Sequence, residues 1–520
     1  MTNAPSWSSL NIKGLYYIAF AVFVYCFYAA WIWYQGVYSE LQDVRASHTT
    51  TLADNKSRAT EQRALYEEIE RLKTSHDDQV QQLVGQINTL NNTFKEFGYA
   101  NHPNGRLPGG EDVVIVVKTG ATEAFKALPI HLSTTLTHTP DFLLFSDHEQ
   151  QIGQYHIQDS LDEMSEDIMK GNKDFDLYRE QKTFMALGQS PEFLELKGGW
   201  DLDKYKNIHM LAKTWQQRPN AKWYVFIDAD SYLVLSNLFR YLDNLDHNKR
   251  LYMGSGAVVN DVVFAHGGTG YAISQGAVKH VMEQQPTMAH DIEKMASENC
   301  CGDYVIAEVM KKHGIDISNV NPVFQGEPMY RIDFHQDKYC KPVVSLHHMR
   351  PEDVGDMWTF ERSFAKPGEY ILFQDIFEHF IYPHLKPRRD EWDCMSLGHG
   401  DEKELPPNLL DGKRVTVFDN EKNDTVTHTQ PLSDEEKKEK VFAACHDVCK
   451  KDKHCLQFRT WKQECKTRDK IELGWSVPRG RDDIKDFTSG WMMDRVEEMR
   501  KMKPCKQPKK GWPKGEVGGS

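Results

Sequence analysis

The stretch KWYVFIDADSYLVLSNL, from Lys222 to Leu238, decides the fold of this chain. Its first part, Trp223 to Ile227, is a continuous run of apolar, aromatic and β-branched residues, which predicts a strand buried on both faces of a mostly parallel sheet. Polar residues begin abruptly at Asp228. In an extended backbone Asp228 and Asp230 project to the same side, and ligands of open α/β sheets bind beyond the carboxyl ends of the strands. Two anionic carboxylates with no cationic side chain beside them suit a hard divalent cation, so we expect this pair to bind one.

An acidic turn is the alternative interpretation of Asp228 and Asp230, because Asp and Ser are common turn residues. The context favours the metal site: the strand before the pair is strongly apolar, and Ser236 or Asn237 is a plausible cap for a helix that continues through Leu245.

Length and charge limit the possible classes of protein. The chain has 520 residues, of which 40% are hydrophobic, so it can hold two or three domains with a substantial core. Its 76 acidic and 63 basic residues give a formal net charge of −13. Together with the lack of any basic patch with interleaved aromatic residues, this charge argues against a nucleic-acid partner.

The amino-terminal region predicts a membrane anchor. No charged residue occurs from Gly14 to Ser39, a stretch long enough to cross a bilayer once as a helix, with Tyr and Trp near its ends. It is too long for a cleaved signal peptide. We assign residues 1–13 to a cytosolic tail and 14–38 to the transmembrane anchor, so that the chain from residue 39 onward lies in the lumen of the secretory pathway.

The cysteines support this orientation. Nine of the ten lie beyond the anchor, and a lumen favours disulfides among them. Zinc is the alternative, but only His446 and His454 accompany the late cysteines and no paired C-x-x-C occurs. Sequons at Asn55, Asn91 and Asn423 are compatible with a glycoprotein. Six cysteines fall in the last quarter of the chain: Cys394, Cys445, Cys449, Cys455, Cys465 and Cys505.

Residues 39–110 predict a helical stem. They are mostly polar, with apolar residues at helical spacing such as Leu65, Ile69 and Leu72, and then Val80 and Leu83. A coiled coil that pairs two copies of the chain is one interpretation. An extended, solvated spacer is the other, because the repeat is short.

From Val113 the chain alternates strands and helices, which predicts a doubly wound α/β domain. Expected strands are Val113–Lys118, Phe142–Asp147, the Asp-x-Asp strand and Leu251–Ser255. Helices are expected from near Thr122 and within Lys204–Gln217, and residues 152–176 are expected to form a surface loop. The strand ends predict a crevice lined by Thr119, Gly120, Ser146, Asp147, Asp228 and Asp230.

Three later motifs complete the candidate site. FAHGGTGYAIS, Phe264 to Ser274, has three glycines that allow close approach to a ligand; a tight turn before a helix over Gln275–Glu283 is the alternative. ENCCGDYVIAEVMKKHG places Asp303 at a helix start, as a cap or as a general base. KPVVSLHHM, Lys341 to Met349, predicts a strand in which Val343, Ser345 and His347 share one face and His348 points away. His347 is either a metal ligand or a histidine satisfied in the core.

In this order, the anchor, the Asp-Ala-Asp strand, the GGTGYAIS turn, the GDYVIAEVMKKHG helix and the SLHHM histidine resemble family 31 of the inverting glycosyltransferases. The likeness is greatest to the fungal branch near Fringe and the core 1 β-1,3-galactosyltransferases, and it covers about Val113 to Phe380. It implies a GT-A-type nucleotide-sugar transferase domain, which we place at residues 111–390. Two departures from the family pattern are Gly302, where an acidic residue is usual before the base, and Ala229 between the aspartates.

The resemblance also implies roles for individual residues. Asp228, Asp230 and His347 would hold Mn²⁺ and the diphosphate of UDP, and Asp303 would be the catalytic base. The remaining residues would contact the donor, either at its nucleotide or beside its sugar: Thr119, Gly120, Asp147, Lys204, Gly267, Gly268 and Gly270.

The carboxy-terminal cysteines resemble a PAN or Apple module, placed at residues 391–505 and followed by a tail over 506–520. CHDVCKKDKHCLQF and Cys465 carry this likeness. It implies the bridges Cys449–Cys455, Cys445–Cys465 and Cys394–Cys505. For Cys300, Cys301 and Cys340 we expect one bridge and one free thiol.

These observations predict a Golgi type II enzyme that transfers a hexose with inversion from a UDP-sugar to a glycan or glycoprotein. Galactose in β-1,3 linkage is the best expectation. A non-catalytic carbohydrate-binding or chaperone-like luminal protein, acting through the carboxy-terminal module, is the alternative. A glycoside hydrolase is excluded because Asp228 and Asp230 are too close together to flank a sugar ring.

Overall fold

The computed structural model describes Trp31, residues 109–191, 198–364, 369–395, 400–477 and 486–501, and Cys505. Apart from Trp31, these residues belong to one compact unit, Arg106–Ser520. The predicted cytosolic tail, the anchor except Trp31, the stem up to residue 108 and the tail over 506–520 lie outside the described residues. Within the described ranges, no helix has both the length and the apolarity needed to cross a membrane.

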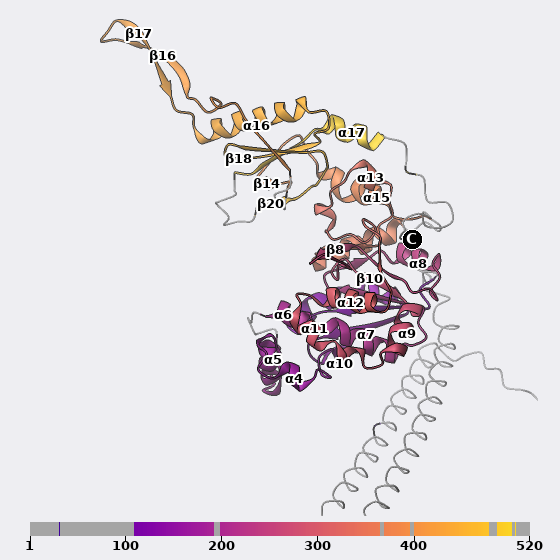
Figure 1. Cartoon of the computed structure of the whole chain (residues 1–520). Helices are drawn as coiled ribbons and strands as arrows, with labels where there is room; N and C mark the ends of the chain where they lie inside the picture. The colour runs from indigo at the N-terminus through magenta and orange to yellow at the C-terminus, as the bar shows by residue number, and fades with distance from the viewer. Residues whose placement is uncertain are drawn as a thin grey trace, which may run out of the picture. The chain divides into compact units, whose positions relative to one another are not determined.

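The central sheet is mixed, with parallel strands at its middle (Figure 1). β1 is paired in parallel with both β2 and β5, and β4 continues the parallel arrangement beyond β2. β10 runs antiparallel to β5 and β7, which departs from the expected doubly wound order. The eight strands lie in the order β11 (Ile317–Asn319), β7 (Tyr252–Gly254), β10 (Tyr271–Ser274), β5 (Trp223–Asp228), β1 (Val113–Lys118), β2 (Asp141–Ser146), β4 (Tyr155–Asp159) and β3 (Gln150–Ile152).

Alternation along the central strands builds two cores. Val114 and Val116 of β1 contribute to the core beneath α7 (Lys206–Gln217), α9 (Gln275–Gln284) and α12 (Gly302–Lys312). Ile115 and Val117 contribute to the opposite core, with α3 (Ala124–Ser133) and α8 (Leu235–Asp243). Figure 1 shows α7, α9 and α12 gathered on one side of the sheet. The prediction that the central strand is buried on both faces is therefore confirmed.

Three local predictions are wrong. Residues 152–176 are not a loop, because they contain β4 and the short helices α4 (Glu166–Met169) and η2 (Lys173–Phe175). The cap of α8 is Val234, because Ser236 and Asn237 lie inside the helix and bind other parts of the chain instead. The expected strand over Lys341–Met349 is reduced to β12 (Ser345–Leu346), which pairs with β6 (Tyr232–Leu233).

The carboxy-terminal part forms a second sheet, covered by α16 (Asp434–Lys451). Its strands lie in the order β13 (Arg389–Asp390), β21 (Thr488–Trp491), β18 (Gln457–Trp461), β19 (Glu464–Arg468) and β15 (Asp401–Lys403). Cys445 and Cys449 of α16 are bonded to Cys465 and Cys455, as the PAN-type resemblance implied. These two bridges bond α16 to β19 and to the residues just before β18.

The other disulfide predictions need correction. Cys505 is bonded to Cys340, not to Cys394, and Cys394 is a buried free thiol whose sulfur lies 3.6 Å from the carbonyl oxygen of Phe458. Cys300 and Cys301 are bonded to each other as the one expected bridge, but none of the three is a free thiol, because Cys340 is bonded to Cys505. Spacing along the chain does not show the Cys340–Cys505 bridge, because its two halves are 165 residues apart.

Residues from both sides of the predicted boundary at residue 390 share one apolar core. Tyr232 and Phe334 pack in the same apolar cluster as Ile471 and Trp491. Phe334 and Ile471 also exchange backbone hydrogen bonds of 2.8 and 2.9 Å. The carboxy-terminal part therefore packs against the α/β part and is not a separate domain.

Candidate active site

Buried charges meet where β1, β2 and β5 end. Lys118 and Asp228 are register partners at the ends of β1 and β5, and Lys118 Nζ lies 3.2 Å from Asp228 Oδ1 while also pairing with Asp203. Lys206, in the first turn of α7, places its Nζ 3.1 Å from Asp147 Oδ1 and 3.3 Å from Asp203 Oδ1. Five side chains thus form one alternating network, and the expectation that no cationic side chain lies beside Asp228 is wrong.

The charge state of this network follows from its geometry. Burial lowers the pKa of Lys118, but Asp203 and Asp228 outweigh burial, so the pKa lies above its ordinary value. Burial raises the pKa of Asp147, but Lys206 and the Ala121 N–H outweigh it, so this carboxyl stays ionised. Burial also raises the pKa of Asp228, with only partial relief from Lys118. Burial lowers the pKa of Lys206, but Asp147 and Asp203 outweigh burial, so both lysines carry their charge.

Asp230 belongs to a different group of side chains. Its Oδ1 lies 3.4 Å from His347 Nε2 and its Oδ2 lies 3.6 Å from His348 Nδ1. The prediction that His348 points away is wrong, because His348 has a left-handed φ of 55°, which ends the strand alternation. Burial would raise the pKa of Asp230, but its hydrogen bonds to the two histidines hold that pKa well below its usual range.

The two aspartates separate because β5 ends at Asp228. The next residues turn, and the Ser231 N–H closes that turn on the Asp228 carbonyl at 3.0 Å. His131, buried beneath it, places Nε2 2.8 Å from the Ala229 carbonyl oxygen. Asp228 therefore lies beside Lys118, where β5 and β1 end, whereas Asp230 lies beside His347 and His348, which follow β12.

The residues around Asp230 fit a metal ion. Ligand atoms of Asp230, His347 and His348 all lie within 4.8 Å of one another, and a carboxylate with two imidazoles suits a borderline divalent cation. A Cβ at Gly268 would lie 2.2 Å from His347 Nε2, so glycine leaves the space that the imidazole needs. Of the predicted ligands, Asp230 and His347 are together; Asp228 lies outside this group, and His348 joins it.

The glycine loop lies against the predicted base. The Gly267 N–H donates a 2.6 Å hydrogen bond to Oδ2 of Asp303, which is 8% exposed. The Ser231 hydroxyl donates to the Gly268 carbonyl at 2.7 Å, so the same loop is tied to the Asp230 turn. Gly270 has a φ of 79°, a left-handed conformation that favours glycine.

Close packing explains why residue 302 is a glycine. A Cβ at this position would lie 2.9 Å from both the Lys204 carbonyl oxygen and Cγ of Asn207. The start of α12 therefore touches the start of α7 too closely for any side chain. The acidic residue usual at this point of the family pattern does not fit in this chain.

Other predicted residues have structural partners. Lys204 Nζ lies 2.8 Å from Asp174 Oδ2, outside the Lys118 network. Asp147 accepts the Ala121 N–H at 2.8 Å and so holds the turn containing Thr119 and Gly120. Ser146 is fully buried in its own turn and does not line a crevice.

Sequence reasoning missed four members of the site: Lys118, Asp203, Lys206 and His348. Asp203 and Lys206 are three residues apart at a helix start in WDLDKYKN, a spacing that places them on one face. A small pocket adjoins Asp228. Its lining consists of Lys118, Asn207, Met210, Phe226, Ile227, Asp228, Gly267 and Tyr271.

Comparison with models of protein families gives a match to part of the chain. Residues 109–352 match the family model described as Fringe-like, a segment that contains all of the candidate site residues. No curated protein matches the chain. The match supports a Fringe-like glycosyltransferase, a class that takes UDP-sugars as donors.

Proposed function

We propose that this chain is an inverting, metal-dependent glycosyltransferase that transfers a hexose from a UDP-sugar to a hydroxyl of a glycan or glycoprotein. One observation carries the proposal. The Asp230 group, the Lys118–Asp228 pair and Asp303 converge at the carboxyl ends of the strands, within the segment that matches the Fringe-like family. Galactose as the sugar and β-1,3 as the linkage are our leading choices, from the resemblance in the sequence.

Asp230, His347 and His348 would hold the cation, with Mn²⁺ as the leading choice because histidine ligands suit it better than Mg²⁺. When bound, this cation would neutralise negative charge on the departing UDP. Gly268 would preserve the space for the His347 ring. Asp228 would position Lys118 through their ion pair and would not be a ligand of the metal ion.

Lys118 and Lys206 would supply fixed positive charge for the donor phosphates. Both are nearly buried, at 10% and 3% side-chain exposure, and each is held between two carboxylates. Their positions are therefore set before the donor binds, which reduces the entropy cost of binding.

Asp303 would accept the proton of the acceptor hydroxyl as that oxygen attacks the anomeric carbon from the face opposite UDP. The hydrogen bond from the Gly267 N–H would orient Oδ2 of this carboxylate. No covalent intermediate is needed.

We also propose a luminal location in the Golgi, with a single amino-terminal anchor. Its support is the uncharged stretch Gly14–Ser39 and the four disulfides of the described residues, because such bonds persist in oxidising compartments. Pairing of two copies through the stem and a PAN-type identity for the carboxy-terminal module stay predictions.

The test is release of UDP by the full-length protein over a panel of UDP-sugars, with Mn²⁺ or with a chelator. We expect one donor to support metal-dependent turnover, Asp230→Asn to abolish it, and Asp303→Asn to bind UDP without turnover. Asp141→Asn is the matched control, because Asp141 is also ion-paired but lies at the opposite end of β2. Absence of UDP binding and turnover with every donor would refute the proposal and favour the non-catalytic alternative.

A further inference from the structure

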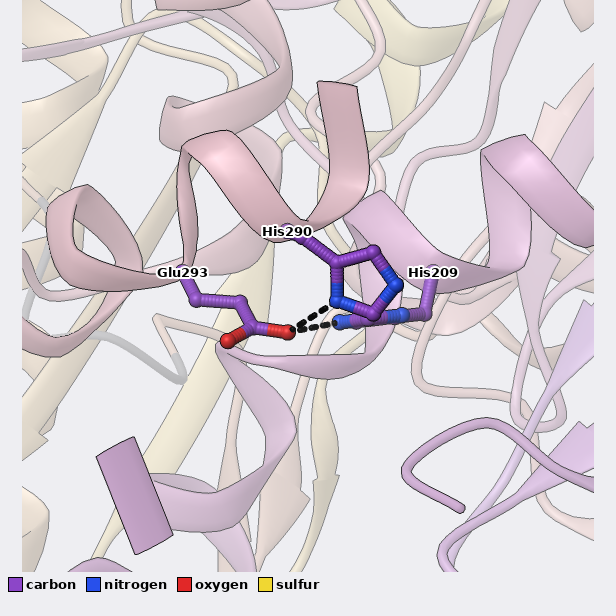
Figure 2. A group of neighbouring side chains, drawn as sticks. All are labelled: His209, His290 and Glu293. Atoms are coloured by element: carbon purple, nitrogen blue, oxygen red, sulfur yellow. Dashed lines mark hydrogen bonds and ion pairs between the residues drawn. The ribbon is translucent and has the colours of Figure 1, made fainter. Parts of the chain in front are cut away.

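A second group of potential metal ligands lies outside the proposed active site. His209 is on α7, His290 is on α10 (Met288–Asp291), and Glu293 begins α11 (Glu293–Glu298). Figure 2 shows the two imidazoles directed at one oxygen of the Glu293 carboxylate. Glu293 Oε1 lies 3.0 Å from His209 Nε2 and 3.1 Å from His290 Nδ1.

These distances suit a tetrahedral ion. With bonds of about 2.0 to 2.1 Å, two ligand atoms of a tetrahedral zinc site are about 3.3 Å apart. The observed separations of 3.0 and 3.1 Å differ from this by only a few tenths of an ångström. One ligand atom from each of the three side chains lies within 4.8 Å of the others. The two contacts between histidine and Glu293 therefore need to change by only a few tenths of an ångström to hold an ion.

The burial of the group favours a cation. The side chains of His209 and Glu293 are 0% and 1% exposed, whereas that of His290 is 50% exposed and gives access from solvent. Besides the histidines, Glu293 accepts the Ser165 N–H, at 3.2 Å from each oxygen. Within the described ranges, no lysine or arginine forms an ion pair with Glu293. A buried carboxylate without a cationic partner is unfavourable, and a divalent ion would supply the missing charge.

The position of the group suggests what the ion would stabilise. α7 begins with Lys206 of the active-site network, and the chain from α11 continues through Cys300 and Cys301 into α12, which carries Asp303. A link between α7 and the α10–α11 segment therefore braces the two elements that position Lys206 and Asp303.

We propose that His209, His290 and Glu293 form a second metal-binding site of this chain, for a transition-metal ion, with zinc as the preferred ion. Two imidazoles and one carboxylate are a common zinc ligand set, and solvent can provide the fourth ligand beside His290. This inference does not rest on the proposed transferase activity, because its readout is the metal itself.

The experiment uses the full-length chain without a histidine tag, in an Asp230→Ala/His347→Ala background that removes the other candidate site. After dialysis against metal-free buffer, we expect about one zinc per chain by mass spectrometry. Loading with Co²⁺ should produce the visible absorption of a tetrahedral site. Glu293→Gln and His290→Gln should each lower retained zinc at least about tenfold, because each removes a ligand.

His156→Gln is the matched control. His156 Nε2 also lies 2.9 Å from a glutamate oxygen, that of Glu149, but this exposed pair has no second histidine, so the variant should retain its zinc. Circular dichroism identifies folded variants, and the half-exposed His290 gives a substitution that the fold tolerates. Two outcomes would overturn the proposal. If the Asp230→Ala/His347→Ala protein had neither stoichiometric zinc nor a Co²⁺ spectrum, the three side chains would form only a hydrogen-bonded group. If folded His290→Gln protein kept one zinc per chain, His290 would not be a ligand.

Discussion

The substitution Gly268→Ala adds one methyl group beside the proposed metal site of Asp230, His347 and His348, and so tests that site. The added Cβ would lie 2.2 Å from both Nε2 and Cε1 of His347, whereas non-bonded atoms normally lie about 3.5 to 4.0 Å apart. The imidazole must therefore move by about 1.3 Å or rotate away. Metal bonds tolerate displacements of only about 0.2 Å, so His347 would be lost as a ligand. We expect Mn²⁺ binding to weaken by about 100-fold, or about 2.8 kcal/mol.

The assay is Mn²⁺ titration of UDP-sugar turnover by the full-length protein, together with direct titration of Mn²⁺ binding. Backbone strain does not complicate the change, because the φ of Gly268 is not left-handed. Gly355→Ala is the control, because its Cβ would meet Ile130 Cδ1 at an ordinary 3.8 Å and Gly355 is not among the predicted donor contacts. If folded Gly268→Ala protein bound Mn²⁺ as tightly as the wild type, His347 would not be a ligand and the proposed site would be wrong.

Three further substitutions test other parts of the chain. Gly267→Ala places a Cβ 3.2 Å from Asp303 Oδ2, so we expect kcat to fall by about tenfold with little change in Mn²⁺ dependence. An unchanged kcat would mean that this loop does not position Asp303. Gly302→Glu, which restores the usual family residue, should cost about 3 kcal/mol of unfolding free energy in urea, because its Cβ meets the Lys204 carbonyl; a stable variant would contradict the packing argument. Burial raises the pKa of Asp159 to about 6, so its contribution to stability is complete below about pH 4 and is lost as the pH rises through 6. The loss is about 3 kcal/mol for a shift of about two pKa units, and urea titrations at several pH values should show that Asp159→Asn removes it.

The sequence predicts the central strands well because their evidence is local. Val113–Lys118 and Trp223–Ile227 are apolar without interruption, and such runs need two covered faces. β4 was missed because in YHIQD only Ile157 is both apolar and buried, and the strand is held by its parallel neighbour β2. Pairing of this kind depends on residues distant in the chain.

The sequence predicts only part of the site, because some of its contacts also depend on residues distant in the chain. Asp230, His347 and Asp303 lie in motifs that are readable one at a time, and the structure places them around one glycine loop. The role of Lys118 depends on the register between β1 and β5, which sets it opposite Asp228. The position of His348 depends on a left-handed backbone, which is uncommon for residues other than glycine. The spacing of residues along the sequence shows neither the register between β1 and β5 nor the backbone conformation of His348.

The loop from His266 to Gly270 connects the parts of the site physically. Gly267 holds Asp303, Gly268 makes room for His347 and accepts the Ser231 hydroxyl, and Ser231 closes the turn that separates Asp228 from Asp230. A displacement of this loop therefore moves the base and the metal ligands together. Substitutions at Gly267 and Gly268 should consequently be non-additive, since groups that share partners couple in double-mutant cycles. Additive effects would mean that the base and the metal site are positioned independently, by α12 and by the chain after β12.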